Sequence, residues 1–171
     1  MKTRGATPGV FLGLVLLSSV GLGAAPRFAV EDQRRKVHDA RAVFGGDRVT
    51  VIVGGDERRT GEAIRDWVKL LPKDRPFRLY GLADLDGVPF FVPNQSVRDN
   101  LIELVPDVPV LCDFDGELTE QLAFPAGEAN VQVYFRSRKV GTVLGPASRE
   151  KAAQVLALVR TASVSERRTA R

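Results

Sequence analysis

Hydrophobic and polar residues follow one another along this chain in a pattern that predicts strands and helices in turn. Residues 48–55, "RVTVIVGG", are apolar and β-branched, which is typical of a strand buried on both faces of a parallel sheet. They lead into residues 56–72, where apolar side chains recur at helical spacing as far as Pro72. That stripe consists of Ile64, Trp67, Val68 and Leu71. The pattern predicts a buried strand and then a helix with Trp67 in the core.

The same alternation continues to the end of the chain. We expect strands at 77–83, 108–114, 130–135 and 139–145, and helices at 96–106, 117–124 and from about Ser148 onward. Ser96 and Asp99 are expected to cap the first of these helices. A polar turn at 136–138 joins the last two strands into an antiparallel hairpin. Near the start, short alternating runs at 28–30 and 36–39 flank a polar turn and predict a small hairpin.

This order of elements predicts an α/β domain with a mainly parallel central sheet, covered by helices on both faces. With its N-terminal hairpin and closing ββα unit, it resembles the thioredoxin fold. Two segments carry the likeness, "FAVEDQRRKVHD" at 28–39 and "VPVLCDFDGELTEQLAF" at 108–124. They resemble the opening hairpin and the inserted segment of the branch that contains peroxiredoxins and extracytoplasmic thiol-disulfide proteins. Within that branch, the chain is most similar to exported members that lack the redox CxxC motif.

The first residues have the pattern of an export signal. Lys2 and Arg4 precede an apolar run from Val10 to Leu22, and small residues follow. The run is shorter than the about 20 residues that a membrane-spanning helix needs. We expect residues 1–24 to be a cleaved signal peptide, residues 27–160 a thioredoxin-like domain and residues 161–171 a disordered basic tail. The protein is then extracytoplasmic, either periplasmic or secreted, with no permanent membrane anchor after cleavage.

The charge balance argues against a nucleic-acid partner. The formal net charge is +4, and it falls to +2 once Lys2 and Arg4 are removed. Most of the remaining excess lies in the tail, "SVSERRTAR" at 163–171. A nucleic-acid-binding domain carries a much stronger basic excess. We expect an unknown protein or a small anion as partner, no nucleic acid, and no cofactor.

In redox-active relatives, the thiol motif lies where the first central strand enters its helix. Here that position reads "GGDERRTGE", residues 54–62, without a cysteine, and Asn130 stands where a cis-proline is usual. The resemblance therefore implies a binding or accessory module without thiol redox chemistry. The alternative is a thiol oxidoreductase or peroxidase that uses Cys112, the only cysteine. Because Cys112 lies in an apolar strand, we expect it to be buried and inert.

Asp113 and Asp115 follow Cys112 in an Asp-x-Asp-Gly sequence, which is the spacing of phosphatases that use an aspartate nucleophile. The surrounding pattern of that enzyme class is missing, because Glu117 stands where threonine is wanted. "DLDG" at 84–87 repeats the same spacing. We therefore expect Asp-x-Asp-Gly to be turn chemistry. A phosphatase is a remote alternative, weak divalent-ion binding stays open, and no metal site is expected.

The loop that opens the first long helix is the most interesting remaining feature. Gly55, Arg58, Arg59 and Thr60 place backbone amides, guanidinium groups and a hydroxyl at a helix N-terminus, which favours anions. These four residues are a speculative anion-binding site. The structural alternative is a solvated loop in which Asp56 or Thr60 caps the helix.

Two further side-chain groups call for an interpretation. His38, the only histidine, has no second nitrogen or sulfur ligand in sequence reach, so we expect it on the surface. Phe90 and Phe91 lie in the proline-bounded loop "GVPFFVPNQS" at 87–96. We expect them to be buried by loop packing, with an exposed partner patch as the alternative.

Overall fold

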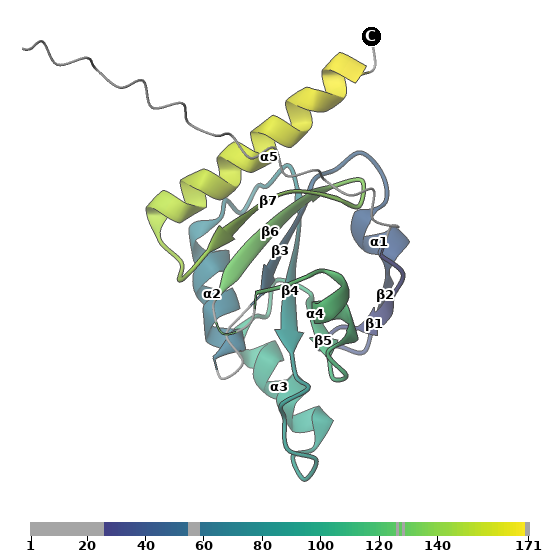
Figure 1. Ribbon diagram of the computed structural model, residues 1–171. Helices are drawn as coiled ribbons and strands as arrows, with labels where there is room; N and C mark the ends of the chain where they lie inside the picture. The colour runs from purple at the N-terminus through teal and green to yellow at the C-terminus, as the bar shows by residue number, and fades with distance from the viewer. Residues whose placement is uncertain (1–25, 55–58, 126, 128, 170–171) are drawn as a thin grey trace, which may run out of the picture.

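A computed structural model describes residues 26–54, 59–125, 127 and 129–169. Its core is a sheet of five strands in the order β5-β4-β3-β6-β7 (Figure 1). These strands are β3 (Thr50–Gly54), β4 (Arg78–Asp84), β5 (Val110–Asp113), β6 (Asn130–Phe135) and β7 (Arg138–Leu144). β3, β4 and β5 are mutually parallel, whereas β6 is antiparallel to β3 and to β7. The predicted α/β sheet, hairpin and closing ββα unit are confirmed.

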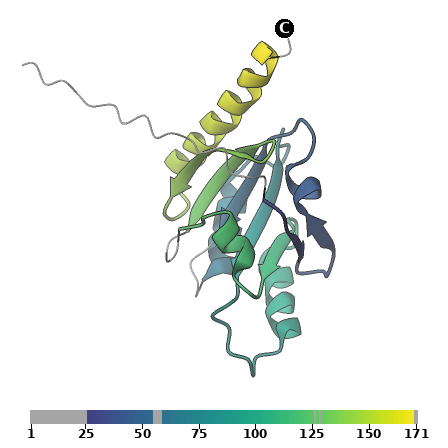
Figure 2. The same ribbon diagram turned by 45° about the vertical axis from the view of Figure 1, so that its right-hand side comes forward.

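Helices and a small hairpin cover the two faces of the sheet (Figures 1 and 2). One apolar cluster joins the sheet to α2 (Thr60–Leu70), α3 (Asn94–Leu104) and α5 (Arg149–Thr169). The second cluster joins the opposite face to α1 (Ala40–Phe44) and α4 (Glu117–Gln121). Trp67 is fully buried in the first cluster, as its helical spacing predicts. The sheet is therefore buried on both faces, which explains why β3 is apolar throughout.

The N-terminal hairpin lies along the β5 edge of the sheet. Its strands β1 (Ala29–Glu31) and β2 (Val37–Asp39) pair with each other, and a single bridge joins Asp32 to Leu111 of β5. The backbone amide of Gln33 donates to the carbonyl oxygen of Val110 at 3.0 Å. The hairpin thus satisfies polar backbone groups that an uncovered edge strand would expose.

The structure differs from the sequence expectations at several element ends. α1 was not predicted, and it forms because the Asp39 side chain accepts from the Ala42 amide at its N-terminus. α3 begins at Asn94 after Pro93, so Ser96 and Asp99 do not cap it. α5 continues as helix to Thr169, and Ala162 is buried, so the segment from residue 161 does not start as a disordered tail. The expected signal peptide lies outside the described residues.

Candidate functional site

The first turn of α2 follows β3, at the place where the resemblance described above puts the thiol motif of redox-active proteins. α2 begins at Thr60 after Arg59, whose side chain makes no capping hydrogen bond. The next residue, Gly61, lies against α3, where an added Cβ would come within 2.6 Å of a Leu104 methyl group. Because Thr60 and Gly61 are buried, this turn is packed into the domain, and Arg59 is its exposed side chain.

A cleft of about 530 Å³ lies beside this turn, and we call it the α2 cleft. It is bounded by α2, by the chain just before β6, and by the connection from β7 to α5. Its lining residues are Arg59, Glu62, Ala63, Asp66, Gly127, Ala129, Leu144, Gly145, Pro146, Ala147 and Lys151. The α2 cleft brings together three segments that are far apart in the sequence.

The walls of the α2 cleft are small and apolar, with charges of both signs. Gly145 holds a positive φ of 90°, and its amide donates to the carbonyl oxygen of Ala129 at 2.6 Å. At this φ an added side chain would be strained, so the position favours glycine, whereas the nearby Lys151 ammonium group is the end of a flexible side chain. Leu144 is half exposed beside it. Small residues let a bound chain approach closely, and the charges can fix its direction.

The predicted anion-binding set is only partly within the described residues. Gly55 and Arg58 lie outside them, as does the alternative capping residue Asp56. Arg59 is exposed and lines the α2 cleft. Thr60 is buried as the first residue of α2, and the position before the helix belongs to Arg59 instead. The anion site therefore stays a prediction.

Cys112 is buried in β5, as its apolar surroundings predict. Its sulfur lies 3.5 Å from the Val110 carbonyl oxygen and at one wall of a second cavity, of about 260 Å³, between the hairpin, β5 and α4. Burial raises the pKa of the thiol to about 12, although the nearby Arg98 guanidinium opposes the rise. At neutral pH the sulfur is therefore protonated, which makes it a poor nucleophile.

Asp113 and Asp115 form a turn, as the repeated Asp-x-Asp-Gly sequence predicts. Asp113 is buried and accepts hydrogen bonds from the Leu118 amide and from both the amide and the hydroxyl of Thr119. Asp115 accepts from the Glu117 amide at 3.3 Å. Burial raises the pKa of Asp113. The interaction of Asp115 with Asp113 lowers the pKa of Asp115. Both carboxyl groups accept hydrogen bonds from the first turn of α4, so their role is structural.

Asp84, in the second Asp-x-Asp-Gly sequence, makes the same kind of turn by accepting from the Asp86 amide at 3.3 Å. Among the described residues, no three His, Cys, Asp or Glu side chains are arranged to hold a metal ion.

Four polar side chains are buried where the hairpin meets β5 and α3, and we call them the β5 polar cluster: Asp32, Gln33, His38 and Arg98. His38 was expected on the surface, and that prediction is wrong, because its Nε2 lies 2.9 Å from the Asp32 carboxylate. Burial alone would raise the pKa of Asp32. Hydrogen bonds from His38 and from two backbone amides outweigh it and lower the pKa.

The other two members of the β5 polar cluster bind across long stretches of sequence. Arg98 donates to the Asp32 carbonyl oxygen and to the Glu31 carboxylate, and its guanidinium lies 5.1 Å from the centre of the Phe114 ring. Gln33 donates to the carbonyl oxygens of Val105 and Val108 and accepts from the Val110 amide. Sequence reasoning missed this cluster, whose only signal was the unusually polar turn between two apolar runs.

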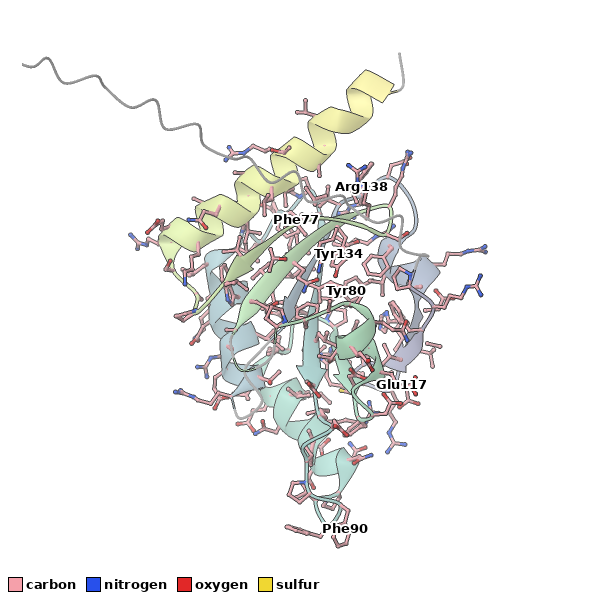
Figure 3. The ribbon with its side chains drawn as sticks, viewed as in Figure 1. Phe77, Tyr80, Phe90, Glu117, Tyr134 and Arg138 are labelled. Atoms are coloured by element: carbon pink, nitrogen blue, oxygen red, sulfur yellow. The ribbon has the colours of Figure 1, made fainter. Side chains whose placement is uncertain are left out.

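Phe90 and Phe91 are exposed, so the expectation that the loop buries them is wrong. The Phe90 side chain is 100% exposed and that of Phe91 is 73% exposed. Figure 3 shows Phe90 at the far tip of the molecule, with its ring directed away from the body. Within the part of the chain that the structure describes, no helix is long and apolar enough to cross a bilayer.

Solved structures with the same architecture are known. A secreted disulfide oxidoreductase of Mycobacterium tuberculosis is 11% identical, with a TM-score of 0.56 over 79% of this chain and 96% of that one. An exposed lipoprotein thioredoxin of Streptococcus pneumoniae is 13% identical, with a TM-score of 0.58 over 77% of this chain and 98% of that one. A peroxiredoxin-like protein of Aquifex aeolicus is 15% identical, with a TM-score of 0.56 over 78% and 84% of the two chains.

No protein-family model matches the chain, and no curated protein sequence is significantly similar to it. The likeness to solved structures therefore establishes the fold. The structural neighbours are thiol-disulfide oxidoreductases and related proteins, and they include secreted and peroxiredoxin-like members. This chain has the thioredoxin-like fold that its element order predicts.

Proposed function

We propose that the protein is an exported binding module that holds an extended segment of a partner protein in the α2 cleft and performs no thiol chemistry. One observation carries the proposal. The α2 cleft lies beside the helix turn where the resemblance places the thiols of redox-active proteins, yet none of the described residues that line it contains sulfur. The only cysteine lies in β5, two strands away from β3.

The lining of the α2 cleft favours a polypeptide segment over a small anion. Arg59 and Lys151 bring positive charge, but Glu62 and Asp66 line the same space and repel an anion. An extended chain carries an amide donor and acceptor at every residue, and its side chains can match charges of both signs. Ala63, Ala129 and the other small residues leave room for its backbone.

Export rests on the start of the chain and on the neighbours. Lys2 and Arg4, followed by the apolar run, form a signal pattern. The structural neighbours include a secreted enzyme and an exposed lipoprotein. A periplasmic or secreted location is therefore part of the proposal.

A thiol enzyme that uses Cys112 is the competing function. The cavity of about 260 Å³ gives the sulfur a small space beside Arg98. The pKa of about 12 opposes this function, because it leaves almost no thiolate at neutral pH. A second cysteine, which would resolve a disulfide within the chain, is absent.

The test is to select peptides from a displayed random library on the purified domain and then to measure the affinity of the selected peptides. Ala63→Trp fills the cleft from a partly buried position on α2, and we expect it to weaken binding by about tenfold or more, equivalent to at least ~1.4 kcal/mol. Ala153→Trp, on the exposed side of α5, is the matched control and should leave the affinity unchanged.

Cys112→Ser separates the two functions, because it removes the only thiol without touching the α2 cleft. Peptide binding that survives in this variant and is lost in Ala63→Trp supports the proposal. Selected peptides that bind Ala63→Trp as well as the wild type would reject the α2 cleft as the site. Peroxide consumption or disulfide reduction that disappears in Cys112→Ser would replace the proposal with the thiol enzyme.

A further inference from the structure

The loop between β4 and α3 presents an apolar tip that no other part of the described chain covers. The Phe90 and Phe91 rings meet edge to face, with centroids 5.8 Å apart, so they contact each other at the end of the loop. Residues 87–97 carry no charged side chain. Phe90 is 100% exposed and Phe91 is 73% exposed, and contiguous exposed apolar side chains of this size are typical of interaction sites.

The tip is held in shape by its own backbone. The Val88 amide donates to the carbonyl oxygen of Leu85 at 3.0 Å, and the Val92 amide donates to that of Pro89 at 2.9 Å. Pro89 and Pro93 fix the backbone φ angle on either side of the aromatic pair. Because the loop is ordered before it binds, less conformational entropy is lost on binding.

The size and convexity of the tip decide what it binds. Two phenylalanine side chains offer about 300–500 Å² of surface, whereas a stable protein interface buries about 1,200–2,000 Å². Figures 1 and 3 show that the loop projects from the domain, so no flat surface surrounds the rings to enlarge the contact. A protein partner would need a deep matching pocket. A lipid bilayer accepts a convex apolar tip without one, and aromatic rings favour its interface.

We propose that the Phe90–Phe91 tip inserts into the surface of a lipid bilayer and holds the domain there reversibly. This inference is independent of the α2 cleft and goes beyond the proposed function. The insertion is apolar rather than electrostatic. Asp84, Asp86 and Asp99 lie on the segments that flank the tip. Among the described cations, Arg35 donates to Gln95 at 2.7 Å, and Arg98 is buried and paired with Glu31. Anionic headgroups therefore add nothing to binding.

The test uses a fluorescent reporter at the tip. The only natural tryptophan, Trp67, is fully buried and gives a constant background. In Phe90→Trp, we expect phosphatidylcholine vesicles to shift the added emission to shorter wavelength, and lipids with a quencher on the acyl chain to reduce it. Val164→Trp is the matched control, because Val164 is 56% exposed on α5. Figure 1 shows this helix at the other end of the molecule from the β4–α3 loop. Its emission should not change.

Vesicle flotation of the full chain gives the second measurement. We expect Phe90→Ser with Phe91→Ser to lower the binding constant for phosphatidylcholine vesicles by about 100-fold, since each buried ring contributes about tenfold. Both side chains are exposed, so the unfolding transition should not move and misfolding is excluded as the cause. Added phosphatidylglycerol should not strengthen binding.

Three results would overturn the proposal. The first is vesicle binding that the double serine variant retains. The second is binding that requires phosphatidylglycerol, because it would assign the membrane contact to basic residues elsewhere. The third is Phe90→Trp emission that does not change when vesicles are added but shifts as protein concentration rises. That result would assign the tip to a contact between copies of the chain.

Discussion

The β5 polar cluster and the α2 cleft lie on the same domain and contain the same kinds of side chain, but they differ in burial. In the cluster, Asp32, His38 and Arg98 are buried and bonded to one another or to nearby backbone. In the cleft, Arg59 and Asp66 are exposed. Buried polar groups are expensive to leave unpaired, whereas exposed ones are free to exchange water for a ligand. Burial therefore indicates a structural role for the first region and supports the binding role that we propose for the second.

Paired substitutions, one in each environment, test this difference. The largest effect is expected at Gln33, whose side chain makes three buried hydrogen bonds that join the hairpin to α3 and β5. Gln33→Ala leaves those backbone groups without partners and should lower the free energy of unfolding by about 3 kcal/mol. Gln154→Ala, on the exposed side of α5, should change it by less than about 0.5 kcal/mol. Urea unfolding measures both, and equal losses would show that the hairpin is not a fixed part of the fold.

One substitution made in both regions sharpens the comparison. Arg98→Gln removes the charge that bonds Glu31 and stacks on Phe114, and we expect a loss of about 2–3 kcal/mol. Arg59→Gln, at the mouth of the α2 cleft, should cost less than about 0.5 kcal/mol but weaken binding of the selected peptides. Thermal unfolding and peptide titration separate the two effects. A large stability loss in Arg59→Gln would mean that the cleft charges are structural as well.

Two buried aspartates should respond to pH in opposite directions. The pKa of Asp32 lies below its ordinary value of 3.8, so its carboxylate stabilises the fold above that pH and the contribution is lost as pH falls through the lowered pKa. Asp32→Asn should therefore cost about 2 kcal/mol near neutral pH and much less in acid. The pKa of Asp113 is raised, so protonation of its carboxyl favours the folded state as pH falls.

Asp113→Asn mimics that protonated form, and we expect it to cost less than about 1 kcal/mol near neutral pH. Unfolding followed across pH for the two variants and the wild type measures the difference. Asp32→Asn and Asp113→Asn curves that run parallel would contradict the opposite pKa shifts. Asp113→Asn should also cause no change in phosphate-ester hydrolysis, because we expect the wild type to have none. The Asp113 carboxylate already accepts hydrogen bonds from Thr119 and Leu118.

Periodicity predicts what depends on local sequence. The apolar strands, the stripe that buries Trp67, the burial of Cys112 and the Asp-x-Asp-Gly turns all follow from residues close together in the chain. The β5 polar cluster does not, because Arg98 finds its partners 66 and 67 residues away, and only the folded chain brings them together. His38 reads as a surface residue for the same reason.

The prediction that Phe90 and Phe91 are buried is wrong for the opposite reason, because here the local pattern is clear and the folded chain does not follow it. Hydrophobicity predicts burial of Phe90 and Phe91, but neither ring packs against an apolar cluster, although Val88 of the same loop packs against the first one. The lining of the α2 cleft was equally beyond periodicity. Arg59 was singled out, whereas Ala129, Gly145 and Lys151 carry no sequence signal of binding and meet only through the closing ββα unit.

The central claim, that this thioredoxin-like domain works without thiol chemistry, is tested most directly by the rate at which native Cys112 reacts with a thiol reagent near neutral pH. A thiol with a pKa of about 12 and an exposed fraction of 3% should react at least ~1,000-fold more slowly in the native protein than in denaturant. Cys112→Ser, which has no thiol, gives the background level of labelling. Rapid labelling of the native protein at the rate of the denatured chain would contradict the account.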